Sequence, residues 1–262
     1  MYTFDYQRPA DRAAAATAYK GEARYLAGGQ SLIQAMKLRL STSEVLVDLG
    51  GIADLKGIKV DAASVTIGAM TTHASVAQSA DVQKAIPALA ELAENIGDPL
   101  VRNRGTIGGS IANADPAADY PSAVVGLGAT IITNQRQISG DDFFTGLFET
   151  ALQPGEIITA VRFPIPEKAG HAKLRQPASR FAITGVFVIK NKDLVRVAAT
   201  GVGPSVFRLT QAEAALQKNF VPSALDGITL DSNGLNSDIH ASALYRAHAA
   251  VEMTRRAVAA AR

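Results

Sequence analysis

The chain contains no cysteine among its 262 residues. That absence excludes a disulfide scaffold, a cysteine nucleophile and any iron–sulfur cluster held by thiolates of this chain. The sequence also lacks a dense block of lysine and arginine, and its formal net charge is only +2, so we expect no nucleic-acid partner. No apolar run approaches the length of a membrane span, and the polar N-terminus, MYTFDYQRPADR, is unlike a signal peptide. We therefore expect no membrane span and a cytoplasmic location.

Groups suited to direct catalysis are also scarce. The four histidines are not spaced like metal ligands, and no Ser–His–Asp arrangement can be recognised. They are His73, His171, His240 and His248. We predict neither a metal site nor a catalytic side chain on this chain.

Two glycine-rich turns are the most informative features that are present. One segment, 102–119, carries Gly105, Gly108 and Gly109 and then two aspartates; the other is Ala27–Leu32. Glycine lets backbone N–H groups approach a ligand, and successive N–H groups form a concave nest for phosphate. Neither turn has the common dinucleotide or P-loop spacing. Spacing alone therefore leaves two interpretations open, phosphate binding and plain turns that join strands to helices.

The pattern along the chain changes near residues 164–170, which are rich in proline. Before this stretch, strands and helices are both expected; after it, two β-rich runs flank a polar turn and predict an antiparallel hairpin. The expected strands are 24–27, 45–49, 65–68, 129–133, 157–163, 181–189 and 194–201, and the expected helices are 10–19, 31–40, 87–96, 121–127, 210–217 and 240–262. This order predicts an α+β protein with an α+β C-terminal domain.

Six segments of the chain carry a resemblance to a known family. They are FDYQRPAD (4–11), AGGQSLIQAMKLRL (27–40), VRNRGTIGGSIANADPAADYPSA (101–123), GEIITAVRFP (155–164), KLRQPASRFAITGV (173–186) and DIHASALYR (238–246). In this order they resemble the FAD-binding (medium) subunit of the molybdenum hydroxylases, the family of carbon monoxide dehydrogenase, xanthine dehydrogenase and aldehyde oxidoreductase. The resemblance covers nearly the whole chain.

The resemblance also implies a domain organisation. Residues 1–165 would form an FAD-binding domain of two α/β lobes, with a break near residues 50–57. Residues 171–262 would form a C-terminal flavoprotein domain, with a small antiparallel sheet and helices. FAD would lie extended between the lobes and this second domain.

By the same resemblance, the two glycine-rich turns would hold the two phosphates of FAD. The first phosphate would contact residues of the first turn, where Ser31 also caps the following helix. The second turn would hold the other phosphate and approach the isoalloxazine. The residues of these two turns are Ala27, Gly28, Gly29, Gln30, Ser31, Leu32, Thr106, Gly108 and Gly109. A Cβ at Gly108 or Gly109 would push the ligand away.

Six further residues match cofactor-binding positions of the family. Asn113 offers an amide beside the second turn, and Asp119 matches an aspartate that binds the FAD sugar or ribityl chain. Asp115 belongs to the same motif, but capping of a turn before Pro116 explains it equally well. Ile96 (adenine) and Ile158 (flavin ring) match apolar contacts, although core packing accounts for either. Lys173 matches a lysine near the flavin pyrimidine, with Arg175 as a competing choice.

The resemblance implies a function as the electron-transfer subunit of a heterotrimer or its dimer. A large subunit would carry a molybdenum–pterin cofactor, a small subunit would carry 2Fe-2S clusters, and FAD on this chain would pass electrons to an external acceptor. Three alternatives remain: a free-standing FAD oxidoreductase of the wider fold, a non-catalytic nucleotide-binding module, and an assembly subunit without FAD. The organic substrate and the acceptor cannot be read from this chain.

Overall fold

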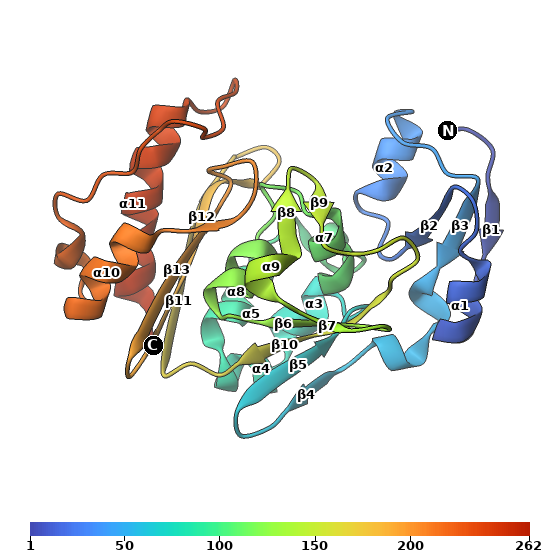
Figure 1. Ribbon diagram of the computed structural model, residues 1–262, viewed down its shortest axis with the longest axis horizontal. Helices are drawn as coiled ribbons and strands as arrows, with labels where there is room; N and C mark the ends of the chain where they lie inside the picture. The colour runs from blue at the N-terminus through green and yellow to red at the C-terminus, as the bar shows by residue number, and fades with distance from the viewer.

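The computed structural model describes residues 1–262 and consists of three parts arranged in a row (Figure 1). Each part is built on its own sheet, and three separate hydrophobic clusters lie beneath these sheets. Helices and strands are mixed throughout, which confirms the predicted α+β class. No helix combines the length and the apolar character needed to cross a bilayer.

The N-terminal lobe is a three-stranded parallel sheet in the order β1-β3-β2. Its elements are β1 (Asp5–Gln7), α1 (Arg12–Ala18), β2 (Ala23–Leu26), α2 (Leu32–Lys37), β3 (Val45–Asp48) and the short helices η1 (Leu49–Gly51) and η2 (Ala53–Leu55). Its small core includes Ala15, Val47 and Leu55, all fully buried. The first glycine-rich turn follows β2 directly.

The central part is a five-stranded antiparallel sheet in the order β4-β5-β10-β6-β7, and it holds the largest core. The strands are β4 (Ile58–Val60), β5 (Ser64–Gly68), β6 (Thr130–Thr133), β7 (Gln137–Ser139) and β10 (Ile158–Pro164), with the small pair β8 (Phe144–Gly146) and β9 (Glu149–Thr150). The helices are α3 (His73–Gln78), α4 (Ala80–Ala85), α5 (Pro87–Glu94), α6 (Pro99–Arg102), α7 (Ile107–Asn113), α8 (Tyr120–Gly126) and α9 (Gly140–Phe143).

The C-terminal part is a four-stranded antiparallel sheet whose outer face is covered by helices (Figure 1). Its elements are β11 (Lys168–Arg175), β12 (Ala182–Asn191), β13 (Leu194–Thr200), β14 (Phe207–Arg208), α10 (Thr210–Lys218), η3 (Pro222–Leu225) and α11 (Ala243–Ala260). The predicted hairpin is β12–β13, with Asn191 paired to Leu194. At Gly170 the sheet meets α11 so closely that a Cβ would lie 1.9 Å from the carbonyl oxygen of Ala257.

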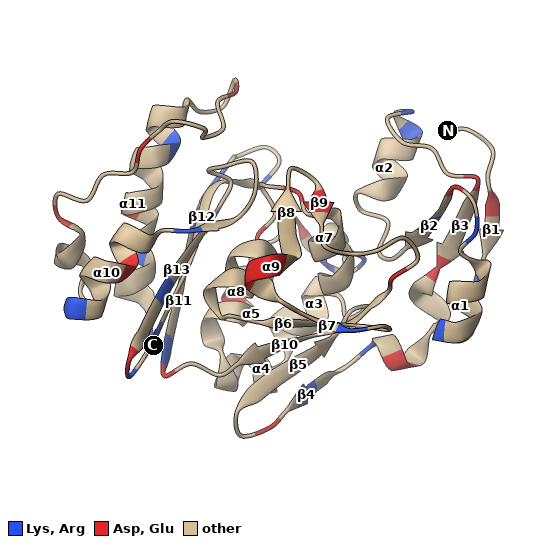
Figure 2. Ribbon diagram, in the orientation of Figure 1, with Lys and Arg blue, Asp and Glu red and all other residues tan.

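Some sequence expectations differ from this structure. The strand β11, which was not among the expected strands, begins at Lys168 within the stretch 164–170. The short strand β7 was also not among the expected strands, and the last helix begins at Ala243 rather than His240. Acidic and basic residues are interspersed in all three parts (Figure 2), in keeping with the low net charge.

Candidate functional site

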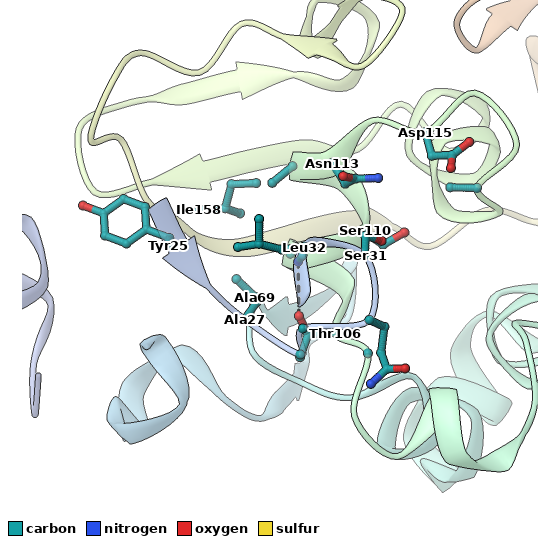
Figure 3. A pocket seen from close by; sticks show the side chains of 18 of the residues that line it. Tyr25, Ala27, Ser31, Leu32, Ala69, Thr106, Ser110, Asn113, Asp115 and Ile158 are labelled. Atoms are coloured by element: carbon teal, nitrogen blue, oxygen red, sulfur yellow. Dashed lines mark hydrogen bonds between the residues drawn. The ribbon is translucent and has the colours of Figure 1, made fainter. Parts of the chain in front are cut away.

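A cavity of about 490 Å³ lies where the three parts meet. Its walls come from the turn after β2 and from the start of α7 (Figure 3). A turn of the C-terminal sheet, at residues 179–181, also lines it. Among the fifteen residues predicted from the sequence, the cavity brings together fourteen: Ala27, Gly28, Gly29, Gln30, Ser31, Leu32, Ile96, Thr106, Gly108, Gly109, Asn113, Asp115, Asp119 and Ile158. Lys173 does not line it.

The first glycine-rich turn has the geometry of an anion nest. Gly29 has φ +72°, a left-handed conformation that favours glycine. The backbone N–H groups of Gly29, Gln30 and Ser31 donate to no protein acceptor. Ser31 begins α2, but its hydroxyl makes no capping hydrogen bond, so the predicted helix cap is wrong. The turn therefore offers free donors to a ligand.

The two glycine-rich segments touch each other through their backbones. A Cβ at Gly28 would lie 2.1 Å from the carbonyl oxygen of Arg104 and 2.8 Å from the Cα of Gly105. Any larger residue at position 28 would push the segments apart. The absence of a side chain here thus allows both turns to face one cavity.

The second glycine-rich turn is the first turn of helix α7. Thr106 is its N-cap, and the Thr106 Oγ1 accepts a hydrogen bond of 3.1 Å from the Gly109 N–H. The N–H groups of Ile107 and Gly108 donate to the carbonyl oxygens of Thr71 and Ala69. These N–H groups are already paired, so the segment offers a ligand close approach rather than a nest of free donors.

Asp119 is a buried carboxylate of the cavity wall. It is 5% exposed, and burial raises its pKa to about 6, although the Lys173 ammonium opposes that rise. The Lys173 Nζ lies 2.9 Å from both carboxylate oxygens, but only Oδ2 accepts a hydrogen bond with good geometry. Oδ1 has no hydrogen-bond partner. Arg175, the competing choice, is exposed at the end of β11.

Three other predicted residues line the cavity and also have a structural role. The Asp115 Oδ1 accepts from the Ala117 N–H at 2.8 Å, which is the turn-capping role, and burial raises its pKa. Ile96 and Ile158 pack against the central core and also line the cavity. Asn113, at the end of α7, lines the cavity too (Figure 3).

Sequence reasoning missed several residues of the wall. Tyr25 donates its hydroxyl to the Gly155 carbonyl oxygen at 3.0 Å. His73 is neutral at physiological pH, because burial lowers its pKa to about 4, and its Nδ1 has no partner. Arg180, with φ +63°, reaches the Gly97 carbonyl oxygen from the turn between β11 and β12. The resemblance covered 173–186, but no local pattern marked this turn as part of the cavity.

These features define a class of protein. A nest of free N–H groups suits a phosphate, a buried carboxylate oxygen without a partner suits a hydroxyl, and aliphatic walls suit a ring system. All three occur in one cavity between the parts of the chain. The residues present therefore fit an extended dinucleotide such as FAD.

Comparison with known proteins identifies the family. Residues 2–166 match the family described as the FAD binding domain in molybdopterin dehydrogenase. The chain belongs to this family and carries its FAD-binding domain. It is of the medium-subunit type found in molybdenum-dependent oxidoreductases.

Relatives match over almost their entire length. The carbon monoxide dehydrogenase medium chain of Afipia carboxidovorans is 38% identical and aligned over 98% of this chain and 96% of that protein. The nicotine 6-hydroxylase medium subunit of Paenarthrobacter nicotinovorans is 32% identical, with 90% and 89% covered. A reconstituted CO dehydrogenase structure from Oligotropha carboxidovorans superposes with a TM-score of 0.90 at 34% identity, covering 99% and 97%.

Proposed function

We propose that this chain is the electron-transfer subunit of a molybdenum hydroxylase complex. Bound FAD would supply the redox chemistry, taking up electrons from iron–sulfur clusters of a small subunit and releasing them to an external acceptor. A large subunit with a molybdenum–pterin cofactor would oxidise the substrate. The absence of cysteine supports this division, because this chain cannot hold such clusters by thiolates.

The observation that carries the proposal is the set of free backbone donors at Gly29, Gln30 and Ser31. These three residues line the cavity, and the neighbouring Gly28 contacts the backbone of Arg104 and Gly105. One phosphate of FAD would bind these N–H groups, and the other would lie toward Thr106 and Gly109. The negative charge of a diphosphate is what such a nest favours.

The other residues of the wall have separate roles in this proposal. Asp119 would accept a hydrogen bond from a sugar or ribityl hydroxyl through its unpartnered Oδ1. Ile96 would pack against the adenine and Ile158 against the flavin ring, and both are already held by the central core. Asn113 and Asp115 would complete the polar side of the wall.

The substrate of the complex does not follow from this chain. Relatives with similar medium subunits are named for carbon monoxide and for nicotine. Such different substrates are consistent with a medium subunit that binds FAD and transfers electrons but does not contact the substrate. The chain would serve the complex in the same way whatever the large subunit oxidises.

The visible spectrum of the purified chain tests the proposal. We expect a flavin spectrum that dithionite bleaches, and FAD in the supernatant after denaturation. The same tagged chain, co-expressed with its partner subunits, should co-purify with molybdenum and iron–sulfur clusters. A colourless protein in both preparations, even after FAD is added, would contradict the proposal. Bound flavin that dithionite does not bleach would favour a non-catalytic nucleotide-binding module.

A further inference from the structure

The buried ion pair between Lys173 and Asp119 joins two parts of the chain at the edge of the cavity. Lys173 lies on β11 of the C-terminal sheet, and Asp119 lies at the start of α8 in the central part. Both side chains are only 5% exposed. The Lys173 Nζ also donates to the carbonyl oxygen of Asn95 at 3.1 Å, so it ties the end of α5 to the start of α8. Lys173 thus contacts Asp119, a residue of the cavity wall, without lining the cavity itself.

The orientation of Asp119 departs from what its position favours. Asp119 is the residue that precedes α8, where an aspartate usually caps the helix by accepting from a backbone N–H. Its side chain makes no such bond. Instead its Oδ2 accepts from Lys173, and its carbonyl oxygen accepts from the Ser122 hydroxyl at 2.7 Å. The carboxylate is thus paired with Lys173 and not with the start of the helix.

The charge of Asp119 also depends on Lys173. Burial favours the neutral acid and raises its pKa to about 6, and the nearby ammonium is what limits this rise. Without the ammonium the pKa would be higher still, so much of the acid would keep its proton at neutral pH. A protonated carboxyl is a weaker acceptor for a hydroxyl than a carboxylate is.

We propose that Lys173 is a positioning residue for FAD: it holds Asp119 charged and oriented, with the buried Oδ1 left without a hydrogen bond for a sugar or ribityl hydroxyl. This inference rests on the proposed function. It differs from a direct contact of Lys173 with the flavin, because Lys173 does not line the cavity and Asp119 does. The C-terminal sheet then contributes to cofactor binding through a residue outside the matched domain, 2–166.

The test measures the affinity of the full chain for FAD, after bound flavin has been removed. Lys173→Met should weaken binding roughly ten- to hundredfold near neutral pH, as expected when a hydrogen bond to a charged group is lost. Lys173→Arg should retain most of the affinity. Lys168→Met, on the same strand but exposed, is the matched control and should bind FAD like the unchanged chain.

The pH profile separates positioning from a purely structural role. Raising the pH by about two units should restore part of the affinity of Lys173→Met, because Asp119 then loses its proton. The unchanged chain should show no such rise. Besides Lys173, Tyr120 follows Asp119 in α8, and Asp115, His73 and Arg180 line the same cavity. These groups are present in both proteins, so the difference between the two profiles reports Asp119.

A double substitution completes the experiment. In an Asp119→Asn background, Lys173→Met should cost little further affinity, because the group through which it acts is gone. This double variant leaves no buried charge unpaired, so it and Lys173→Arg remain informative if Lys173→Met alone does not fold. Equal losses in both backgrounds, or unchanged affinity with a shifted flavin potential, would overturn the inference. A full chain that never binds FAD would contradict the proposed function instead.

Discussion

At the residue scale, two adjacent glycines at the start of α7 have different constraints. A Cβ at Gly108 would lie 2.6 Å from the Cβ of Ala69 and 2.7 Å from its carbonyl oxygen, so position 108 is limited by packing against the end of β5. A Cβ at Gly109 would lie 3.2 Å from the Cβ of Ala27, on the first turn. The expectation that both glycines make room for a ligand therefore applies best to Gly109.

This contrast gives a paired prediction. Gly108→Ala should lower the free energy of unfolding by ~1–3 kcal/mol, because the backbone of Ala69 cannot move aside easily. Gly109→Val should lower FAD affinity by more than about tenfold, since its methyl groups would enter the space between the two turns. Denaturant unfolding and FAD titration of both variants measure the two effects. If Gly109→Val binds FAD normally, the second turn does not approach the cofactor.

At the scale of elements, helix starts that look alike in the sequence differ in the structure. The Ser242 hydroxyl accepts from the Tyr245 N–H at 3.2 Å and caps α11, whereas Ser31 makes no such bond at α2. Ser242→Ala should therefore lower the free energy of unfolding by ~1 kcal/mol. Ser31→Ala should change it by less than about 0.5 kcal/mol in the flavin-free chain. Equal losses in urea unfolding would refute this distinction.

Element prediction succeeded where the pattern is local. The hairpin β12–β13 was evident from two apolar β-rich runs and a polar turn. The strand β11 was not recognised, because its sequence includes a glycine and several charges. Its strand conformation comes from pairing with β12 and from cover by α11, which approaches at Gly170.

At the scale of the whole molecule, the cavity depends on all three parts together. Its walls include Gly29 of the N-terminal lobe, Ile158 of the central sheet and Phe181 beside the C-terminal sheet. A ligand that contacts all three stabilises their arrangement, because it binds only the assembled cavity.

We therefore expect FAD to stabilise the entire chain. At a free concentration of about one hundred times its Kd, FAD should add ~2.7 kcal/mol to the free energy of unfolding. Calorimetry should show one transition that moves to higher temperature. Gly109→Val serves as the control and should show a smaller shift at the same FAD concentration, because it binds FAD more weakly. A transition of the C-terminal part that does not respond to FAD would mean that this part is not needed for binding.

The sequence by itself determined the glycines of the two turns, the absence of thiolate ligands and the family to which the chain belongs. These are local properties, since backbone freedom and side-chain chemistry depend on the residue present. Only the tertiary structure decided which N–H groups stay free at Gly29 to Ser31, and which are taken by Ala69 and Thr71. It also decided that Lys173 forms an ion pair with Asp119 and does not line the cavity. Partners that are distant in the sequence meet only when sheet order and helix packing place them together.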